Sequence, residues 1–527
     1  MYLNIMIWYE LKFIPYHFFL KRRCLHMQKI KNRFLSCIMI FLITFSFLII
    51  GCNSNSVYAK NVSNTTKPLN NINYRIDAKL DHSRHEISGI EHLKFTNIYD
   101  VELNELVFNI FADSYNSEDS KSYGFKKLNE MFPEDLSSDE RLGYLNINSI
   151  KNVENKDVKF TKNNQILRVS LNKPLKKGES VNLKIDFKTK FPMELQRTCC
   201  YKQVYSGLFW YPMLAVYEPK EKKWNEVQYS KCGETDYYEV SNYEVNLEVP
   251  KDFTVEFAGI TTEKINGDKK LVSSIAKNTR EMALFASPKF KRISKTKKDL
   301  TITMLYLSNG NLNEESAYRY VDTAFETINF FNEKYGKYPY KDFDIVETFV
   351  PGFNMEYTRA VQMMPLSPVS YDAIDPILVH EIAHQWFHSV IGNNSEKESC
   401  LDESLTEFAS SYFLENNYPK NGGFKDIINK SEPINLPINS PNSKMTLETS
   451  KLYYEKGGTA FYELYRIIGE DKFNQLIKEY FNKYKFKNAT LNDFLAIVEN
   501  NCGKEVKNHM YKCFNEPNYK LDEKYIK

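Results

Sequence analysis

Two histidines four residues apart, with a glutamate beside the first, are the strongest chemical signal in the chain. They occur in His380-Glu381-Ile382-Ala383-His384. Residues four apart on a helix lie on the same face, so both imidazoles can reach one metal ion, and Glu381 lies next to that face. Imidazole and carboxylate ligands suit zinc. We therefore expect His380 and His384 to bind zinc, and Glu381 to be the general base toward the zinc-bound water.

A third zinc ligand is expected at Glu403, which follows His384 with eighteen residues between them. Two antiparallel helices joined by a short loop can bring this carboxylate back to the imidazoles. Three protein ligands leave one position of the single zinc ion open for catalysis. Glu407, one helical turn later, is expected to orient a ligand histidine. His388 continues the i, i+4 row, but a fourth protein ligand would close the site, so we interpret it as structural or cleft-lining.

Hydrolysis of a carbonyl compound at such a site also needs a hydrogen-bond donor for the developing oxyanion. Our candidate is Tyr454, in Tyr454-Glu455-Lys456-Gly457 at the head of a later predicted helix. We interpret the adjacent Tyr453 as a packing aromatic residue.

Helices are expected to carry all of these residues. Apolar side chains recur every three to four positions from about residue 313. Asp375-Pro376 is an N-cap followed by proline at the first helical position, and Gly392 is expected to follow the end of that helix. The predicted helices cover about 376–391, 402–416, 454–468, 470–483 and 491–501.

Residues 72 to about 300 have the period of two that is typical of strands with one buried face. Tyr74, Ile76, Ala78 and Leu80 alternate with polar neighbours. Asn266-Gly267 is a hairpin signal, and we expect no convincing helix in this region. The sequence therefore predicts a multi-domain α+β protein, with an antiparallel N-terminal β domain over 72–300 and a mainly α-helical domain over 301–527.

The N-terminal segment has the pattern of an export signal. Residues 1–51 hold seven basic side chains and one acidic one, and an apolar run, Phe34–Ile50, leads to Gly51-Cys52. Ile49-Ile50-Gly51-Cys52 resembles a bacterial lipobox, in which Cys52 is lipidated. An uncleaved anchor and a signal-peptidase site after Val57-Tyr58-Ala59 are the alternatives. Each places the body of the protein outside the cytoplasm. We expect it to be anchored at the outer face of the bacterial cytoplasmic membrane, with 53–71 as a flexible tether. Met27 is an alternative start to Met1.

The rest of the chain is close to neutral, because most of the excess positive charge lies before Cys52. This balance gives no electrostatic footprint for nucleic acid. The six cysteines after residue 60 permit many pairings, and the sequence does not choose among them.

With these motifs the chain resembles the aminopeptidase N family of zinc metallopeptidases, gluzincins with HExxH-x18-E. The residues that carry the resemblance are His380–Phe387, the Glu403 segment and Tyr454–Gly457. It implies a saddle-shaped β domain, a thermolysin-like catalytic domain and Tyr454 as the residue that stabilises the oxyanion. The chain ends 73 residues after Tyr454, so we expect no large C-terminal helical domain over the cleft.

The exopeptidase signature of this family is G-x-M-E-N, whose glutamate binds the free α-amine of a peptide. Its counterpart here is Phe353-Asn354-Met355-Glu356-Tyr357. Met355 and Glu356 match and are the expected substrate-binding residues, whereas Phe353 and Tyr357 depart from the motif. We find no clear counterpart of the second amine-binding residue near Phe209–Pro212.

Three functions are compatible with these observations. The resemblance implies an aminopeptidase that releases N-terminal residues from peptides outside the cell. A zinc endopeptidase with an open cleft is the alternative on the same chemistry. The third is an inactive surface lipoprotein that only binds, which the presence of both Glu381 and Tyr454 disfavours.

Overall fold

The computed structural model describes residues 71–370, 372–429, 434–446, 448–449 and 451–525, which lie within one compact unit, Lys67–Lys527. Cys52, the apolar segment before it and most of the expected tether are outside the described residues. Among the helices that are described, none combines the length and the apolar character needed to cross a bilayer.

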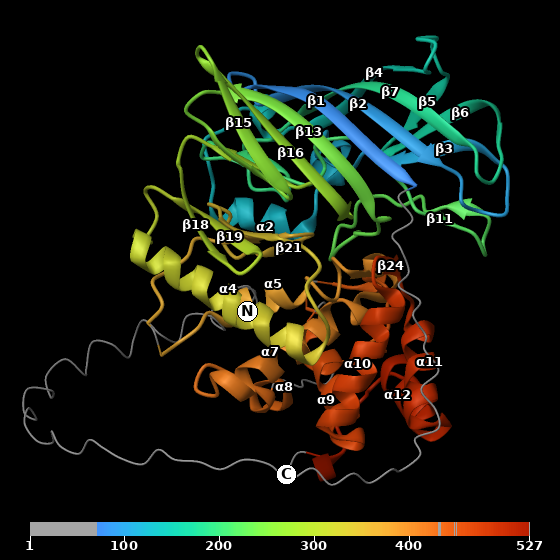
Figure 1. Cartoon of the computed structure of the whole chain (residues 1–527), viewed down its shortest axis with the longest axis vertical. Helices are drawn as coiled ribbons and strands as arrows, with labels where there is room; N and C mark the ends of the chain where they lie inside the picture. Colours follow the sequence, from blue (N-terminus) through green and yellow to red (C-terminus); the bar gives the residue numbers. More distant parts are fainter. Residues whose placement is uncertain (1–70, 371, 430–433, 447, 450, 526–527) are drawn as a thin grey trace, which may run out of the picture. The chain divides into compact units, whose positions relative to one another are not determined.

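A seven-stranded sheet forms most of the first part of the chain (Figure 1). Adjacent strands in this sheet are antiparallel, except for one parallel pair, β1 with β13. In spatial order the strands are β15 (Ile260–Asn266), β16 (Lys269–Thr279), β13 (Ser241–Pro250), β1 (Ile72–Asp81), β2 (Glu86–Thr96), β7 (Ser180–Lys190) and β4 (Tyr144–Lys151). Asn266 pairs with Lys269 across the expected hairpin turn, where Gly267 has φ of 63°.

Smaller sheets complete this β-rich part. One contains β10 (Met213–Leu214), β3 (Leu103–Asn109), β6 (Ile166–Leu175) and β5 (Phe160–Asn163). Another contains β14 (Thr254–Phe257), β17 (Leu284–Ser287), β9 (Val204–Gly207) and β8 (Cys199–Tyr201). β11 (Tyr217–Glu218) pairs with β12 (Lys223–Trp224). Two short helices, α2 (Tyr123–Met131) and α3 (Ser138–Arg141), interrupt the strands, contrary to our expectation.

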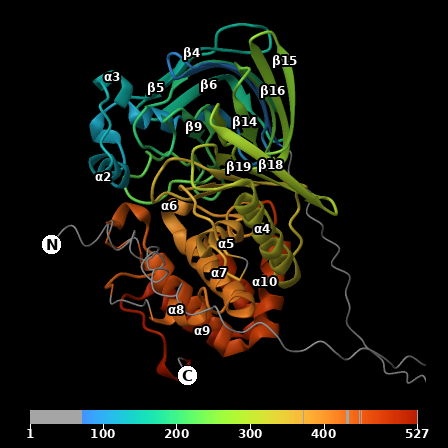
Figure 2. The same cartoon turned by 90° about the vertical axis from the view of Figure 1, so that its left-hand side faces the viewer.

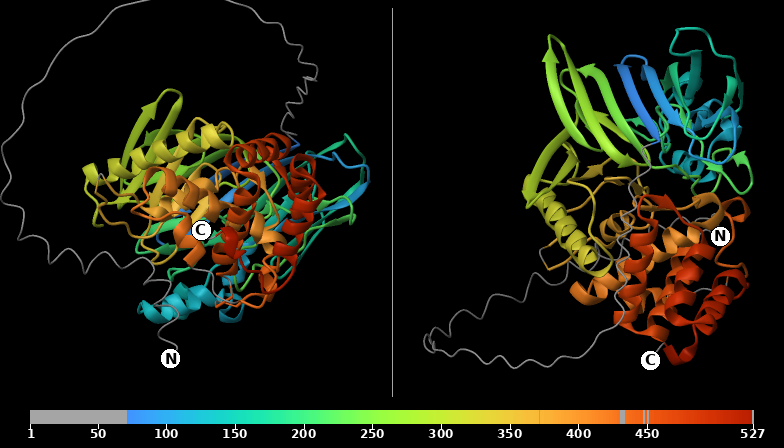
Figure 3. Two further views of the ribbon diagram at one scale, coloured as in Figure 1. Left: turned by 90° about the horizontal axis from the view of Figure 1, so that it is seen from below. Right: turned by 45° about the vertical axis from the view of Figure 1, so that its right-hand side comes forward.

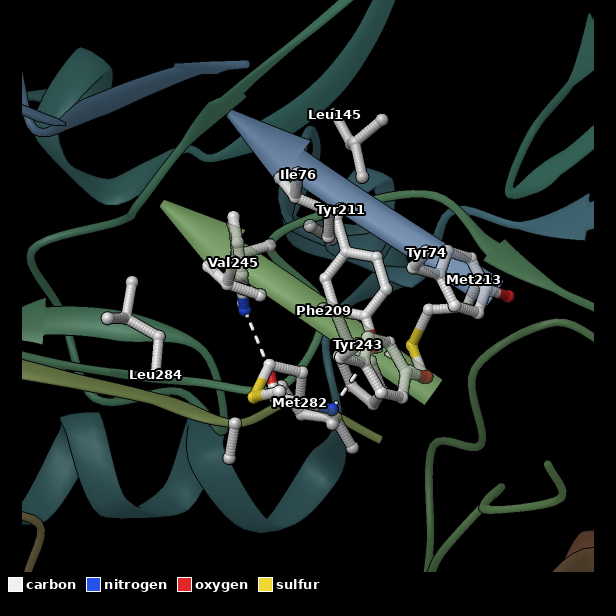
Figure 4. Packing of buried hydrophobic residues seen from close by; sticks show 14 of the residues in the cluster. Tyr74, Ile76, Leu145, Phe209, Tyr211, Met213, Tyr243, Val245, Met282 and Leu284 are labelled. Atoms are coloured by element: carbon white, nitrogen blue, oxygen red, sulfur yellow. Dashed lines mark hydrogen bonds between the residues drawn. The ribbon is translucent and has the colours of Figure 1, made fainter. Parts of the chain in front are cut away.

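Its core follows from the alternation seen in the sequence. Tyr74 on β1 is in register with Tyr243 on β13, and the two rings stack with centroids 4.8 Å apart. Tyr211 packs edge-on against both rings, and Figure 4 shows the three side chains together with Ile76 and Val245. Strands with one buried face therefore supply the core, as the period of two predicted.

A five-stranded sheet leads into the helical part. Its order is β18 (Phe290–Lys297), β19 (Leu300–Leu307), β20 (Asp342–Glu347), β22 (Ala360–Met363) and β21 (Met355–Tyr357). The first long helix, α4 (Glu314–Lys334), lies in the chain between β19 and β20. Its N-cap Asn313 accepts a hydrogen bond from the backbone N–H of Ser316. The three strands after α4 were not predicted, because short buried strands have no clear period of their own.

Helices make up most of the rest of the described chain, with one short strand pair, β23 (Ile391–Gly392) and β24 (Lys487–Asn488). Figure 2 and the right-hand view of Figure 3 show these helices grouped below the large sheet. α5 packs against both α4 and α7. The helices are α5 (Pro376–Ala383), α6 (Ser395–Glu398), α7 (Glu403–Asn417), α8 (Phe424–Asn429), α9 (Gly458–Ile468), α10 (Glu470–Tyr484), α11 (Leu491–Cys502) and α12 (Lys504–Asn515). The α+β class, with a β domain before a helical one, is confirmed.

The helix expected over 376–391 is shorter than predicted. α5 ends at Ala383. Just beyond it, the N–H groups of Gln385 and Trp386 donate to carbonyls three residues back, and those of Ser389 and Ile391 donate to carbonyls five residues back. The regular four-residue pattern is therefore lost, and the backbone leaves the α-helical ladder. The i, i+4 row therefore does not extend to His388 on one helix.

Candidate metal centre

His380 and His384 point the same ring nitrogen toward each other at the end of α5. Asp375 caps the start of this helix through the N–H of Ile377, and proline occupies its first turn. The Nε2 atoms of the two histidines are 3.2 Å apart. The one-turn spacing thus brings two imidazole donors to a single position.

Glu403 joins this pair from the first residue of α7. Its Oε2 lies 3.3 Å from Nε2 of His380 and 3.4 Å from Nε2 of His384. The donor atoms of all three residues lie within 4.8 Å of one another. The structure therefore brings the three predicted ligands together.

The other nitrogen of each ring is held by a carboxylate. Nδ1 of His380 lies 3.2 Å from Oε2 of Glu407, and Nδ1 of His384 lies 2.9 Å from Oδ1 of Asp402. A carboxylate at Nδ1 fixes the ring so that Nε2 is presented to a metal ion. Glu407 therefore contacts a ligand histidine, His380, as the sequence predicted. Asp402 was missed, because nothing in the spacing distinguishes it from any other acid before a helix.

The chemistry of this cluster fits zinc. Two neutral imidazoles and one carboxylate are a common zinc ligand set. Burial opposes positive charge on His380, but its hydrogen bonds with Glu403 and Glu407 outweigh burial and raise the pKa of His380 to about 10. Burial also opposes charge on Glu403, yet both histidines lower the pKa of Glu403 to about 2. The position between these residues therefore favours positive charge, which a divalent cation supplies.

Glu381 lies beside the ligands without joining them. Its Oε2 is buried and accepts no hydrogen bond from the described residues. Burial raises the pKa of Glu381 to about 8, with His380 acting in the opposite direction. A carboxylate oxygen next to a metal position, with no other partner, can accept a proton from a water molecule there.

Tyr454 reaches the cluster from a single turn of π-helix, Tyr453–Gly457. Its hydroxyl donates to Oε1 of Glu403 at 2.9 Å. The hydroxyl of Tyr453 instead donates to the backbone carbonyl of Ser440, and that side chain is buried. The structure thus places Tyr454 at the cluster and Tyr453 in packing, as interpreted from the sequence.

Gly457 explains how this turn comes so close to α7. A Cβ at this position would lie 1.8 Å from Oγ of Ser404, so no other residue fits there without movement. The same close approach lets Ser404 donate to the carbonyl of Tyr453. The glycine of the Tyr454–Gly457 motif therefore sets the distance between Tyr454 and Glu403.

Glu356 enters from β21, the edge strand of the five-stranded sheet, which contacts α5. Its carboxylate, that of Glu381 and a ring nitrogen of His384 lie within 4.8 Å of one another. Burial raises the pKa of Glu356 to about 7, and His384 and His388 oppose the shift. Met355, which was expected with it, belongs instead to the hydrophobic core of the β-rich part, because neighbours on a strand face opposite sides.

His388 lies among acids and not at the metal position. Its Nδ1 is 3.3 Å from Oε1 of Glu356 and 3.4 Å from Oδ2 of Asp402. The ring therefore links the acid of β21 to the acid that orients His384. This contact depends on the folded chain and could not be read from the sequence.

Glu234, between β12 and β13, is a further acid that sequence reasoning missed. Burial, followed by the charges of Glu356 and Glu403, raises the pKa of Glu234 well above its ordinary value. The backbone carbonyl of Glu234 accepts a hydrogen bond from the side chain of Asn442, which also packs on Gly233. The β-rich part thus contributes a second acid near Glu356.

Comparison with known proteins agrees with this geometry. Residues 319–513 match the model of the Peptidase family M1 domain. The chain is 26% identical over 216 residues to aminopeptidase N of Streptomyces lividans, covering 35% of this chain and 25% of that protein. It is 26% identical over 196 residues to human endoplasmic reticulum aminopeptidase 2, covering 33% of this chain and 20% of that protein. The chain therefore matches about a quarter of the length of these relatives, or less.

Solved structures share the fold. An M1 zinc metallopeptidase from Deinococcus radiodurans superposes with a TM-score of 0.60 at 13% identity, over 84% of this chain and 94% of that one. A form of that enzyme bound to a Tyr-Ser-Ala substrate gives a TM-score of 0.62 at 13% identity, over 86% and 96%. At this level of identity the likeness concerns the arrangement of both parts of the chain.

Proposed function

The chain belongs to the aminopeptidase N family of zinc metallopeptidases, and on this premise we propose that it is an aminopeptidase that releases N-terminal residues from peptides. One observation carries the proposal. Three zinc-type donors, His380, His384 and Glu403, lie beside a general-base candidate and two acids, Glu356 and Glu234, that can receive a free amine.

The zinc ion would be held by His380, His384 and Glu403, with Glu407 and Asp402 fixing the two rings. When bound, zinc acts as a Lewis acid on the scissile carbonyl and on the attacking water. Glu381 takes the proton of that water as it attacks the carbonyl carbon, and later delivers it to the leaving amine. Tyr454 turns its hydroxyl toward the carbonyl oxygen and donates a hydrogen bond as negative charge develops there.

Glu356 and Glu234 would fix the direction in which a peptide binds, because they would hold its N-terminal amine. A protonated α-amine placed between Glu356 and Glu234 would form charge-assisted hydrogen bonds with both. It would also relieve the repulsion between these two acids, which adds to burial in raising the pKa of Glu234. An acetylated N-terminus carries no charge and would not relieve this repulsion. The two acids therefore favour cleavage after the first residue.

The endopeptidase is the second candidate, and the departures at Phe353 and Tyr357 favour it. Mass spectrometry of the products from one unblocked peptide of about ten residues separates the two functions. We expect single residues to appear in order from the N-terminus. Internal fragments, with no release of single residues from the N-terminus, would instead indicate an endopeptidase.

We also propose that the protein is exported and carries lipid on Cys52, on the strength of the sequence pattern around Gly51-Cys52. Labelling of cells with a fatty acid should mark the protein, and Cys52→Ala should lose the label. A labelled Cys52→Ala variant would exclude the lipobox. An unlabelled wild-type protein that stays in the membrane would indicate the uncleaved anchor.

A further inference from the structure

A second cluster of zinc-type donors lies between α9 and α12, outside the catalytic centre. It contains Glu463 on α9 and His509 and Cys513 on α12. The donor atoms of the three side chains lie within 4.8 Å of one another. The two helices pack against each other in the folded chain, and Figure 1 shows them near the C-terminal end.

The spacing on α12 repeats that of the catalytic pair. His509 and Cys513 are four residues apart, so they share one face of the helix. This face meets Glu463, whose Oε1 lies 2.7 Å from Nε2 of His509. The arrangement thus presents an imidazole, a thiol and a carboxylate to one point, and these are the three ligand types that zinc prefers.

The carboxylate of Glu463 is held by a hydrogen bond, as is usual for carboxylates that bind metal ions. The hydroxyl of Tyr519 donates to Oε2 of Glu463, which leaves Oε1 directed toward His509. The Glu463 side chain is only 2% exposed, whereas that of His509 is 43% exposed. A hydrogen-bonded carboxylate of this kind is typical of metal sites, and the exposed side of His509 leaves a path for entry and for a water ligand.

Cys513 is buried and forms no disulfide. Burial raises the pKa of the Cys513 thiol to about 12, and the charge of Glu463 adds to the shift. A bound zinc ion would favour the thiolate, because it binds the thiolate directly.

We propose that Glu463, His509 and Cys513 form a second zinc site, which fastens α12 and the segment carrying Tyr519 to α9. On binding, the Cys513 thiol releases its proton to solvent, and the neutral imidazole of His509 binds zinc through Nε2 while carrying its proton on Nδ1. Zinc ligands lie about 2.0–2.3 Å from the ion, so the side chains need only small shifts. The site strengthens the helical part that follows Tyr454.

Metal content gives the first test. The purified full-length chain, dialysed after zinc loading, should hold about two zinc ions, and Cys513→Ser should hold about one. Cys502→Ser is the matched control, because this half-exposed cysteine of α11 is outside the cluster, and it should keep both ions. His509→Gln, at a half-exposed position, should also lose one ion. All three variants should retain wild-type peptidase activity within about twofold, because none of these residues lies at the catalytic centre.

Cobalt substitution gives a test that only this cluster can pass. The catalytic ligands contain no sulfur, whereas Cys513 would give the cobalt form a thiolate-to-metal absorption band. The band should be present in the wild type and in Cys502→Ser and absent in Cys513→Ser. One zinc ion in the wild type and no such band would overturn the proposal. A band that survives Cys513→Ser would overturn it as well.

Discussion

Glu381 is the residue whose loss should separate metal binding from hydrolysis. Glu381→Gln keeps the size of the side chain but cannot accept the proton of the attacking water. We expect unchanged zinc content and a fall in kcat of about 10²–10⁴. Metal analysis and a peptide assay on the same preparation check this. If the variant lost its zinc, Glu381 would have to be placed among the ligands.

Tyr454 and Tyr453 form a matched pair of adjacent tyrosines with different hydroxyl partners, Glu403 and the carbonyl of Ser440. Tyr454→Phe should lower kcat by about 10²–10³ with little change in KM, because its hydroxyl acts mainly in the transition state. Tyr453→Phe should leave kcat near the wild-type value. The opposite pattern in steady-state kinetics would move the assignment by one residue.

Among the site residues, the sequence predicted those that a motif of fixed spacing identifies. His380, His384 and Glu403 come together as the motif required. Asp402 and Glu234 could not be predicted, because their partners become neighbours only in the folded chain. Met355 was expected beside substrate from its place in the motif, and its position on the far face of β21 follows from strand geometry.

Among the elements, the π-helical turn Tyr453–Gly457 depends most on one residue. Gly457→Ala would place a Cβ against Ser404 and push the turn away from α7. We expect a loss of about 1–3 kcal/mol in the free energy of unfolding, as for other overpacked sites, together with reduced kcat. Denaturant unfolding and a peptide assay measure the two effects.

Gly124→Ala in α2 is the control for this substitution, because a Cβ there would meet nothing closer than Oγ of Ser122 at 4.0 Å. Alanine is a better helix former than glycine, so this variant should be neutral or up to about 1 kcal/mol more stable. Equal stability of both variants and the wild type would show that the turn can adapt, and the argument from close approach would fail.

Elements were predicted best where the hydrophobic period was long. The buried positions of β1, β7 and β13 follow the alternation of the sequence. Helix ends were less certain: α5 ends at Ala383 because tertiary contacts of His384 and His388 with Asp402 replace regular helix geometry. Domain boundaries and the export segment remain predictions.

For the whole molecule, the buried carboxyl group of Glu91 should contribute to the change of stability with pH. It lies in the core of the seven-stranded sheet, and neither oxygen has a hydrogen-bond partner among the described residues. Burial raises the pKa of Glu91 well above its ordinary value of 4.5. The folded protein therefore keeps the proton at pH values where the unfolded chain has released it.

The sign of the effect follows from this difference. Above about pH 4.5 the free energy of unfolding should fall by about 1.4 kcal/mol per pH unit on account of Glu91, up to its folded pKa. Glu91→Leu should remove this fall, so its advantage over the wild type grows with pH. Glu244→Gln, on an exposed position of β13, is the control and should change nothing. Parallel stability curves for Glu91→Leu and the wild type would contradict a buried neutral acid.

The central claim is that Glu356 and Glu234 bind the free N-terminal amine of the substrate. One pair of substrates tests it most directly. The measurement is kcat/KM for a single peptide with a free and with an acetylated N-terminus, on the wild type and Glu356→Gln. A charge-assisted hydrogen bond contributes about 1.5–3 kcal/mol, which corresponds to at least a roughly tenfold preference for the free amine. Glu356→Gln should slow the free peptide and leave the acetylated one nearly unchanged. Equal kcat/KM for both peptides in the wild type would contradict the aminopeptidase.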